Sequence, residues 1–268
     1  MMPIILSNCG VGIGTYKLTG DTCSDIVYNA LIMGYRMIDT AVLYKNHSDI
    51  KLAIEKSGIS RNNIYISSKI HDNTQKEQND NNNAIRDSVM SILKELGIDY
   101  LDQLLLHSPV KHKFVSSWKI LEELYNEKII RFIGVSNFRT HELELLLQNC
   151  KIPPYVNQIE LSPFCTRNNL VSFCSSHNII IQAYASLTVG RRLNDANLIA
   201  IAQSLNISPA SLLLSWALHK NYYIIPKADN IKHLYENINV SSIKLDKSII
   251  AKLDALNECY YTIKKHSD

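Results

Sequence analysis

The sequence predicts an α/β protein built as a (β/α)8 TIM barrel with two additional helices, in a single domain over residues 1–268. The chain has 268 residues, 46% of them hydrophobic and 20% charged, which suits one large soluble domain. Short apolar runs alternate with helix-like stretches along the chain, and nearly every run closes in a polar residue. Such alternation predicts parallel βαβ units, and eight of them favour closure into a barrel.

Eight apolar runs are expected to form the barrel strands. In chain order they cover residues 11–15, 36–39, 64–69, 104–107, 132–137, 155–158, 180–184 and 223–227. The carboxyl ends of parallel barrel strands share one rim, and this rim carries the active site of barrel enzymes. The polar residues that close seven of these runs are therefore expected to lie together.

The segments between the runs have the spacing of amphipathic helices. Seven helices are expected, over residues 21–33, 48–56, 84–96, 115–127, 141–148, 170–176 and 210–218. A glycine, a common helix stop signal, follows each of the first three: Gly34, Gly58 and Gly97. Residues 195–205 and 246–256 exceed the eight units and are expected to be the two additional helices. The polar stretch 73–83 is expected to be an exposed loop and the start of a helix.

A doubly wound dinucleotide-binding fold is the main alternative. Gly10 and Gly12 follow an apolar run, and Asp39 ends the next one, where an acid that binds ribose would lie. However, Thr15 replaces the third glycine of that fingerprint, and the next helix begins only near Asp21. The barrel is therefore favoured.

Charge and cysteine content exclude several classes of function. The net charge of +3, with scattered basic residues, makes a nucleic-acid partner unexpected. No C-x-x-C pair occurs, so we expect reduced thiols and no metal site; the six cysteines are Cys9, Cys23, Cys150, Cys165, Cys174 and Cys259. We find no signal-peptide pattern and no apolar stretch long enough to span a bilayer. A cytoplasmic monomer that acts on a small molecule is expected.

Each polar strand end has an ordinary structural explanation when it is taken alone. Asp39 would cap a turn, Lys69 would lie on the surface with its stem on apolar atoms, and His107 would be a satisfied core histidine. Ser136 and Asn137 would cap a helix. A function is indicated only by the way these residues combine.

Together, an Asp, a Tyr, a Lys and a His on one rim supply what carbonyl reduction by a hydride donor requires. A ketone that becomes an alkoxide needs a proton, which Tyr44 would donate. Tyrosine has a pKa of about 10, but the ammonium of Lys69 would stabilise the phenolate and lower that pKa. Asp39 would hold Lys69 in place, and His107 would donate a hydrogen bond to the carbonyl oxygen.

Five segments closely resemble signatures of the aldo-keto reductase family, in the same order and with similar spacing. They are residues 34–46, 96–107, 134–138, 156–160 and 224–227, so the resemblance covers essentially the whole chain. It implies a reductase of aldehydes and ketones that uses a nicotinamide cofactor, usually NADPH. It also implies that Tyr44 is the general acid of a catalytic tetrad made by Asp39, Tyr44, Lys69 and His107.

The same resemblance implies a set of cofactor contacts. Three residues would bind the nicotinamide carboxamide, namely Ser136, Asn137 and Gln158, and Tyr184 would stack on the ring. The adenosine end would meet three more, namely Lys227, Glu236 and Asn237. The whole implied set is Thr15, Tyr16, Asp39, Ser136, Asn137, Gln158, Tyr184, Ser186, Leu187, Lys227, Ala228, His233, Glu236 and Asn237.

The chain departs from the family at the end that would bind the cofactor's 2′-phosphate. Family members commonly have a serine and an arginine where this chain has Ala228 and His233, and Asp229 lies between them. Loss of the guanidinium fork and a hydroxyl weakens phosphate recognition, and a carboxylate repels phosphate. NADPH remains the expected cofactor, with unusual tolerance of NADH.

The substrate pocket departs from the family as well. Two positions that often carry tryptophan are His71 and Ser108 here, so we expect a wider and more polar pocket. Because the sequence ends at Asp268, soon after the last expected helix, we also expect little C-terminal loop over the site.

Two other classes of function stay open. One is a nicotinamide-binding protein of weak activity with a regulatory or interaction role; the intact tetrad argues against it. The other is a different barrel enzyme, such as a sugar isomerase, which is disfavoured because the strand ends lack paired carboxylates or a phosphate loop. The sequence does not predict the physiological substrate.

Overall fold

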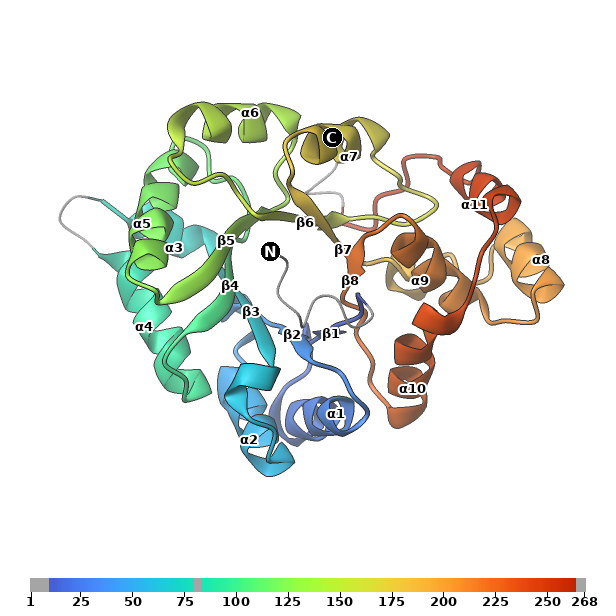
Figure 1. Cartoon of the computed structure of the whole chain (residues 1–268), viewed down its shortest axis with the longest axis horizontal. Helices are drawn as coiled ribbons and strands as arrows, with labels where there is room; N and C mark the ends of the chain where they lie inside the picture. Colours follow the sequence, from blue (N-terminus) through green and yellow to red (C-terminus); the bar gives the residue numbers. More distant parts are fainter. Residues whose placement is uncertain (1–9, 80–82, 264–268) are drawn as a thin grey trace.

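Eight parallel strands form a barrel in the computed structural model, which describes residues 10–79 and 83–263 (Figure 1). The strands pair in chain order, as β1 (Ile13–Gly14), β2 (Met37–Asp39), β3 (Tyr65–Ile70), β4 (Leu101–Leu106), β5 (Ile130–Ser136), β6 (Val156–Glu160), β7 (Ile180–Tyr184) and β8 (Tyr223–Ile224). A parallel bridge between Val11 and Ile224 joins the last strand to the first. The predicted barrel is confirmed, and the doubly wound alternative is wrong.

Helices cover the outside of the sheet (Figure 1). One follows each strand, as α1 (Gly20–Ile32), α2 (His47–Ser57), α4 (Ala84–Leu96), α5 (Phe114–Asn126), α6 (Thr140–Asn149), α7 (Asn168–Ser176), α9 (Pro209–His219) and α10 (Ile231–Asn239). Gly58 and Gly97 each end a helix at a φ of 66°, a left-handed conformation that glycine adopts without steric cost. The predicted stop signals therefore act as expected.

Helix α10 completes the eighth unit and was not expected from the sequence. The Asn230 side chain accepts a hydrogen bond from the backbone N–H of His233 at 2.9 Å, which caps the first turn. Leu234 is fully buried and fixes the helix against the core. Together with Ile238, which also packs against the core, these residues explain why this segment is helical.

Three further α-helices are described, one more than expected. Two fall within the predicted segments, namely α8 (Ala196–Ser204) and α11 (Lys247–Asp254). The third, α3 (Asp72–Glu77), occupies part of the stretch expected to be an exposed loop. Its Gln75 is buried and donates from Nε2 to the backbone oxygen of Ser108 at 3.1 Å, so this part of the expectation is wrong. Residues 80–82 lie outside the described part of the chain.

Short 3₁₀-helices add four turns to the described chain. They are η2 (Val42–Tyr44), η3 (Arg61–Asn63), η4 (Thr188–Gly190) and η5 (Val240–Ser242). Across residues 10–79 and 83–263, no single helix is long and apolar enough to cross a membrane. Helices α8 and α9 pass that criterion only as a pair, which bends by 82°.

The barrel interior has an apolar layer that includes the first residues of β2 and β3. Met37, Tyr65 and Ile225 form a buried cluster there, separate from the large core between strands and helices. Because side chains of a strand alternate between its two faces, the next interior residues after Met37 and Tyr65 are Asp39 and Ser67. The interior therefore becomes polar toward the carboxyl ends of the strands.

Candidate active site

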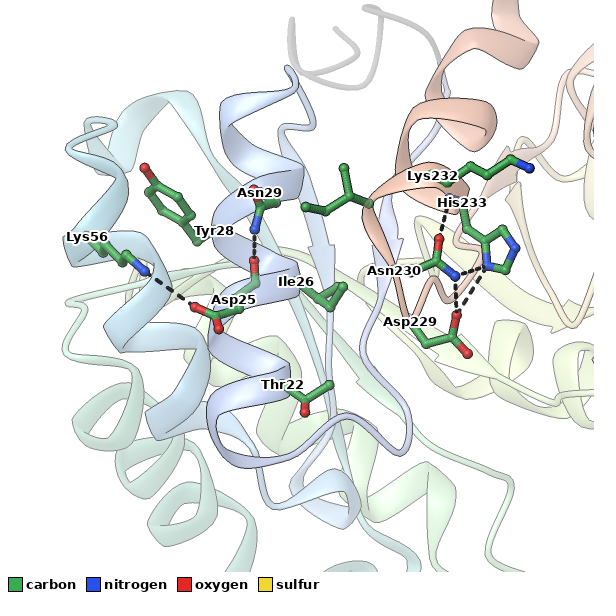
Figure 2. A pocket seen from close by; sticks show the side chains of 11 residues that line it. Thr22, Asp25, Ile26, Tyr28, Asn29, Lys56, Asp229, Asn230, Lys232 and His233 are labelled. Atoms are coloured by element: carbon green, nitrogen blue, oxygen red, sulfur yellow. Dashed lines mark hydrogen bonds and ion pairs between the residues drawn. The ribbon is translucent and has the colours of Figure 1, made fainter.

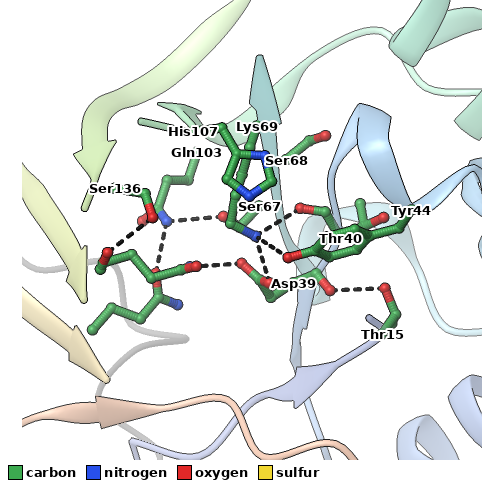
Figure 3. A network of polar contacts seen from close by, with 12 residues as sticks. Thr15, Asp39, Thr40, Tyr44, Ser67, Ser68, Lys69, Gln103, His107 and Ser136 are labelled. Carbon is green, nitrogen blue, oxygen red and sulfur yellow. Dashed lines mark hydrogen bonds and ion pairs between the residues drawn. The ribbon is translucent and has the colours of Figure 1, made fainter. Parts of the chain in front are cut away.

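Asp39 and Lys69 form a buried ion pair at the carboxyl ends of β2 and β3 (Figure 3). The Nζ atom of Lys69 donates to Oδ2 of Asp39 at 2.6 Å and to the backbone oxygen of Thr40 at 2.9 Å. The side chain of Lys69 is 1% exposed and that of Asp39 is 3% exposed. A charge in such a place requires a partner, so each side chain holds the other.

Tyr44 reaches the same ammonium from η2. Lys69 Nζ donates to the Tyr44 hydroxyl oxygen at 3.4 Å. The turn that carries Tyr44 is braced by Asn46, whose Oδ1 accepts from Thr40 Oγ1 at 2.7 Å and whose Nδ2 donates to the Thr15 carbonyl at 3.0 Å. Asn46 is buried, so this brace holds the hydroxyl of Tyr44 close to Lys69.

His107 completes the group by following β4. Its backbone N–H donates to the Ile70 carbonyl at 3.1 Å, which continues the pairing with β3. Its ring meets the ring of Tyr44 edge-on, at 6.1 Å between centroids and 78° between planes. The structure thus brings all four tetrad residues together, with Tyr44 in contact with both Lys69 and His107 (Figure 3).

The pKa of Tyr44 differs from the sequence expectation. Burial, followed by the charge of Asp39, raises this pKa well above 10, whereas we expected Lys69 to lower it. The expectation is wrong chiefly because the phenol is buried, and also because Lys69 is paired with Asp39, so the phenol meets an ion pair instead of an isolated cation. Burial also lowers the pKa of Lys69, and Asp39 acts in the opposite direction. Tyr44 therefore keeps its proton at neutral pH.

The residues expected at the nicotinamide carboxamide also come together. The hydroxyl of Ser136 donates to the Gln158 carbonyl at 2.9 Å, and the Tyr184 hydroxyl donates to Asn137 Oδ1 at 2.7 Å. Asn137 Nδ2 donates to the His107 carbonyl at 2.9 Å and to Ser136 Oγ at 3.1 Å. This cluster of amide and hydroxyl groups therefore adjoins the tetrad.

Four other expected cofactor residues follow β1 and β7. The Thr15 hydroxyl is buried and donates to a backbone carbonyl of β2 at 2.9 Å. Tyr16 is half-exposed, with its ring centroid 5.1 Å from that of Tyr44. Ser186 is buried, and its Oγ has no hydrogen-bond partner among the described residues. Leu187 directly precedes η4 and packs against the core.

The expected adenosine-end residues lie on α10 and the loop before it, and they are Lys227, Ala228, His233, Glu236 and Asn237. His233 Nδ1 is 3.1 Å from Asp229 Oδ1, and this hydrogen bond lowers the pKa of Asp229. Both side chains border a groove between α1 and α10 (Figure 2). The tetrad does not line this groove.

The part of the rim that we expect to face the substrate is polar. Ser108 follows His107, and its hydroxyl donates to Asp72 Oδ1 at 2.6 Å. His71 caps helix α3, with Nδ1 accepting from the Asn73 backbone N–H at 3.1 Å. Both residues that stand in place of tryptophans are therefore held by polar contacts.

The C-terminal segment reaches the barrel rim. The backbone N–H of Thr262 donates to Glu160 Oε1 at 2.6 Å, and that of Ile263 donates to Oε2 at 3.1 Å. Glu160 is the buried last residue of β6. Its carboxylate attaches this segment to the same rim as the tetrad.

His47, which sequence reasoning missed, is part of a buried series of hydrogen bonds close to the tetrad. Its Nδ1 is 2.9 Å from Glu95 Oε2 and its Nε2 is 3.2 Å from Ser68 Oγ. Burial lowers the pKa of His47, and Glu95 acts in the opposite direction. These hydrogen bonds connect α2, the helix after Tyr44, to β3, the strand that carries Lys69.

Gln103 and Gln182 were also missed. Both are buried inside the barrel, and their amides join Ser67, Gln158 and Asp39 in one hydrogen-bond network. The sequence does contain a signal for them. Each glutamine interrupts an apolar strand and lies an even number of residues before a rim residue, so both side chains are on the same, inward face of the strand.

The aldo/keto reductase family model matches residues 10–258, and the chain belongs to this family. It is 36% identical to a glyoxal reductase of Bacillus subtilis over 248 residues, which cover 92% of this chain and 88% of that protein. It is 32% identical to the methylglyoxal reductase DkgA of Escherichia coli over 251 residues, which cover 91% and 89%. These similarities support an oxidoreductase that reduces carbonyl compounds.

Solved structures agree with the fold. An aldo-keto reductase from a Medee basin deep-sea metagenome library superposes with a TM-score of 0.89 at 29% identity, covering 94% of this chain and 92% of that one. The aldose reductase of Schistosoma japonicum gives 0.86 at 28% identity, covering 96% and 93%. The barrel is therefore shared along nearly the whole of each chain.

Proposed function

We propose that this protein reduces small aldehydes and ketones to alcohols with NADPH, that it also accepts NADH, and that Tyr44 is the proton donor. One observation carries the proposal: Lys69 Nζ lies 2.6 Å from Asp39 and 3.4 Å from the Tyr44 hydroxyl, inside a closed barrel rim. The group is buried and costly to assemble, so a purely structural role explains it poorly.

The residues define a path for the proton. Tyr44 is neutral at physiological pH, which is the form that a general acid needs. As the carbonyl oxygen gains negative charge, the Tyr44 hydroxyl transfers its proton to it, and Lys69 stabilises the phenolate that remains. Asp39 keeps the ammonium within reach of that phenolate, and His107 orients the carbonyl oxygen. When bound, a reduced nicotinamide would supply the hydride for the carbonyl carbon.

Features of the site fit a nicotinamide cofactor. The amide and hydroxyl groups of Ser136, Asn137 and Gln158 lie beside the tetrad, where a carboxamide needs donors and acceptors. Ser186 carries a buried hydroxyl with no partner among the described residues, which an oxygen of a bound ligand would satisfy. Tyr184 supplies an aromatic surface at the same rim.

Small polar carbonyl compounds are the favoured substrates. Ser108 and Asp72 make the rim polar where larger apolar side chains would favour aromatic substrates. Two of the related proteins are named for glyoxal and methylglyoxal, which are small dicarbonyls. Such substrates need little apolar surface from the pocket.

The proposal is tested with purified protein, NADPH and a panel that contains glyoxal, methylglyoxal and larger aromatic aldehydes. We expect loss of nicotinamide absorbance matched by an equal amount of alcohol, fastest with the dicarbonyls. Binding of NADPH without consumption by any carbonyl compound would favour the regulatory alternative. Failure to bind either nicotinamide cofactor would contradict both.

A further inference from the structure

A belt of polar side chains, which includes Asp39 of the tetrad, crosses the barrel interior (Figure 3). Asp39, Ser67 and Gln103 are register neighbours across β2, β3 and β4, and Gln158 and Gln182 are register neighbours across β6 and β7. All five side chains are buried, at 3% exposure or less. Interior layers of such barrels are usually filled by branched apolar residues, so this belt is a departure.

The two halves of the belt meet through amide groups. Gln103 Nε2 donates to Ser67 Oγ at 2.9 Å and to Gln182 Oε1 at 3.0 Å. Gln158 Nε2 donates to the same Gln182 oxygen at 2.9 Å and to Asp39 Oδ1 at 2.8 Å. Gln182 Oε1 therefore accepts two hydrogen bonds, which is its full capacity.

The hydrogen count fixes the orientation of Gln158. A primary amide has two N–H donors, and both donors of Gln158 are used by Asp39 and Gln182. Its backbone carbonyl is held as well, by the Ser136 hydroxyl at 2.9 Å and the Asn137 backbone N–H at 3.0 Å. With the nitrogen directed to Asp39 and Gln182, the oxygen is the side-chain atom left to face a ligand.

The opposite orientation is strongly disfavoured. It would place the Gln158 oxygen against a carboxylate oxygen of Asp39 and the amide oxygen of Gln182, which are both acceptors. The donors of Gln103 fix Gln182 in turn, and Gln103 Oε1 accepts from the Tyr65 hydroxyl at 3.0 Å. The donor and acceptor roles of these side chains are therefore linked from Tyr65, in the apolar layer, to Asp39, at the rim.

We infer that Gln182 is a positioning residue for the cofactor: it holds the Gln158 amide so that its oxygen accepts a hydrogen bond from the nicotinamide carboxamide. This inference rests on the proposed function. Gln103 lies on the other side of the barrel and acts on Gln158 through Gln182, so its contribution to cofactor binding is smaller. A leucine at position 182 would fill a similar volume without the acceptor that both amides need.

The test is a set of dissociation constants, measured by calorimetry without any carbonyl substrate. The ligands are NADPH and its 3-acetylpyridine analogue, in which a methyl group replaces the amide nitrogen and no N–H can reach Gln158. The variant is Q182L. The matched control is I181A, which truncates a buried neighbour on the opposite face of the same strand and leaves the belt intact. Unfolding midpoints are recorded for both variants.

We expect Q182L to bind NADPH about 3- to 10-fold more weakly, the cost of about one buried hydrogen bond, and to bind the analogue as the wild type does. I181A should bind both ligands like the wild type. An equal loss for both ligands in Q182L, or no loss for either, would overturn the inference. Wild-type protein that binds neither ligand would overturn the proposed function together with it.

Discussion

Removal of the Lys69 ammonium should damage both folding and chemistry, and a second substitution should separate the two effects. In K69M, the Asp39 carboxylate remains buried without its partner, which costs about 3–5 kcal/mol of unfolding free energy. A full charge 3.4 Å from the Tyr44 oxygen interacts by about 5 kcal/mol at an effective dielectric constant of about 20. Because Asp39 offsets part of this charge, we expect a net loss of about 2–4 kcal/mol, or about 30- to 1000-fold in kcat.

The double variant D39N/K69M supplies the control. Without a buried charge, its unfolding free energy should return to within about 1 kcal/mol of the wild type, since neutral groups replace a buried pair at little cost. Gln158 can still donate to the Asn oxygen, so the interior network survives. We would measure urea denaturation and kcat with saturating NADPH and methylglyoxal. The double variant should stay slow. Recovery of kcat together with stability would refute the electrostatic role of Lys69.

Two further predictions concern the cofactor end and the pH dependence. H233R should raise the kcat/KM preference for NADPH over NADH by about 10-fold, since a guanidinium binds phosphate in a bidentate manner and also offsets Asp229. An unchanged ratio in H233R would contradict this prediction, and a wild-type preference of many thousandfold would contradict the expected tolerance of NADH. Because burial lowers the pKa of His47 below its unfolded value of 6.5, the unfolded chain takes up the proton first, so stability should fall as the pH decreases from 6.5 to the folded pKa. H47Q should flatten that part of the stability curve in urea titrations, and an unchanged slope would contradict the assignment.

Polar residues at strand ends made most of the rim predictable. In a parallel barrel the chain direction alone places the ends of β2, β3 and β4 side by side, so Asp39, Lys69 and His107 had to be neighbours once the strands were recognised. The position of Tyr44 relative to Lys69 depends on η2 and its brace, which follow from Asn46 and not from strand order. The chemistry of carbonyl reduction and the family resemblance both named Tyr44, but strand order alone does not place it.

The missed features share a physical cause. The pKa of Tyr44 depends on the burial of its hydroxyl and on the pairing of Lys69 with Asp39, and a linear sequence shows neither. The belt formed with Gln103 and Gln182 needs strands that lie on opposite sides of the barrel. Each glutamine by itself resembles a tolerated polar residue in an apolar strand. Helix α10 was missed although its apolar face, which includes Leu234 and Ile238, packs against the core.

The most direct test of the account is the substitution Y44F. The change removes one hydroxyl, whose contact within the site is the Lys69 interaction at 3.4 Å, so the fold and the NADPH dissociation constant should change little. With saturating NADPH and methylglyoxal, we predict that kcat falls by about 10²- to 10⁴-fold, the usual contribution of a positioned general acid. A Y44F enzyme that binds NADPH and reduces methylglyoxal as fast as the wild type would contradict the account.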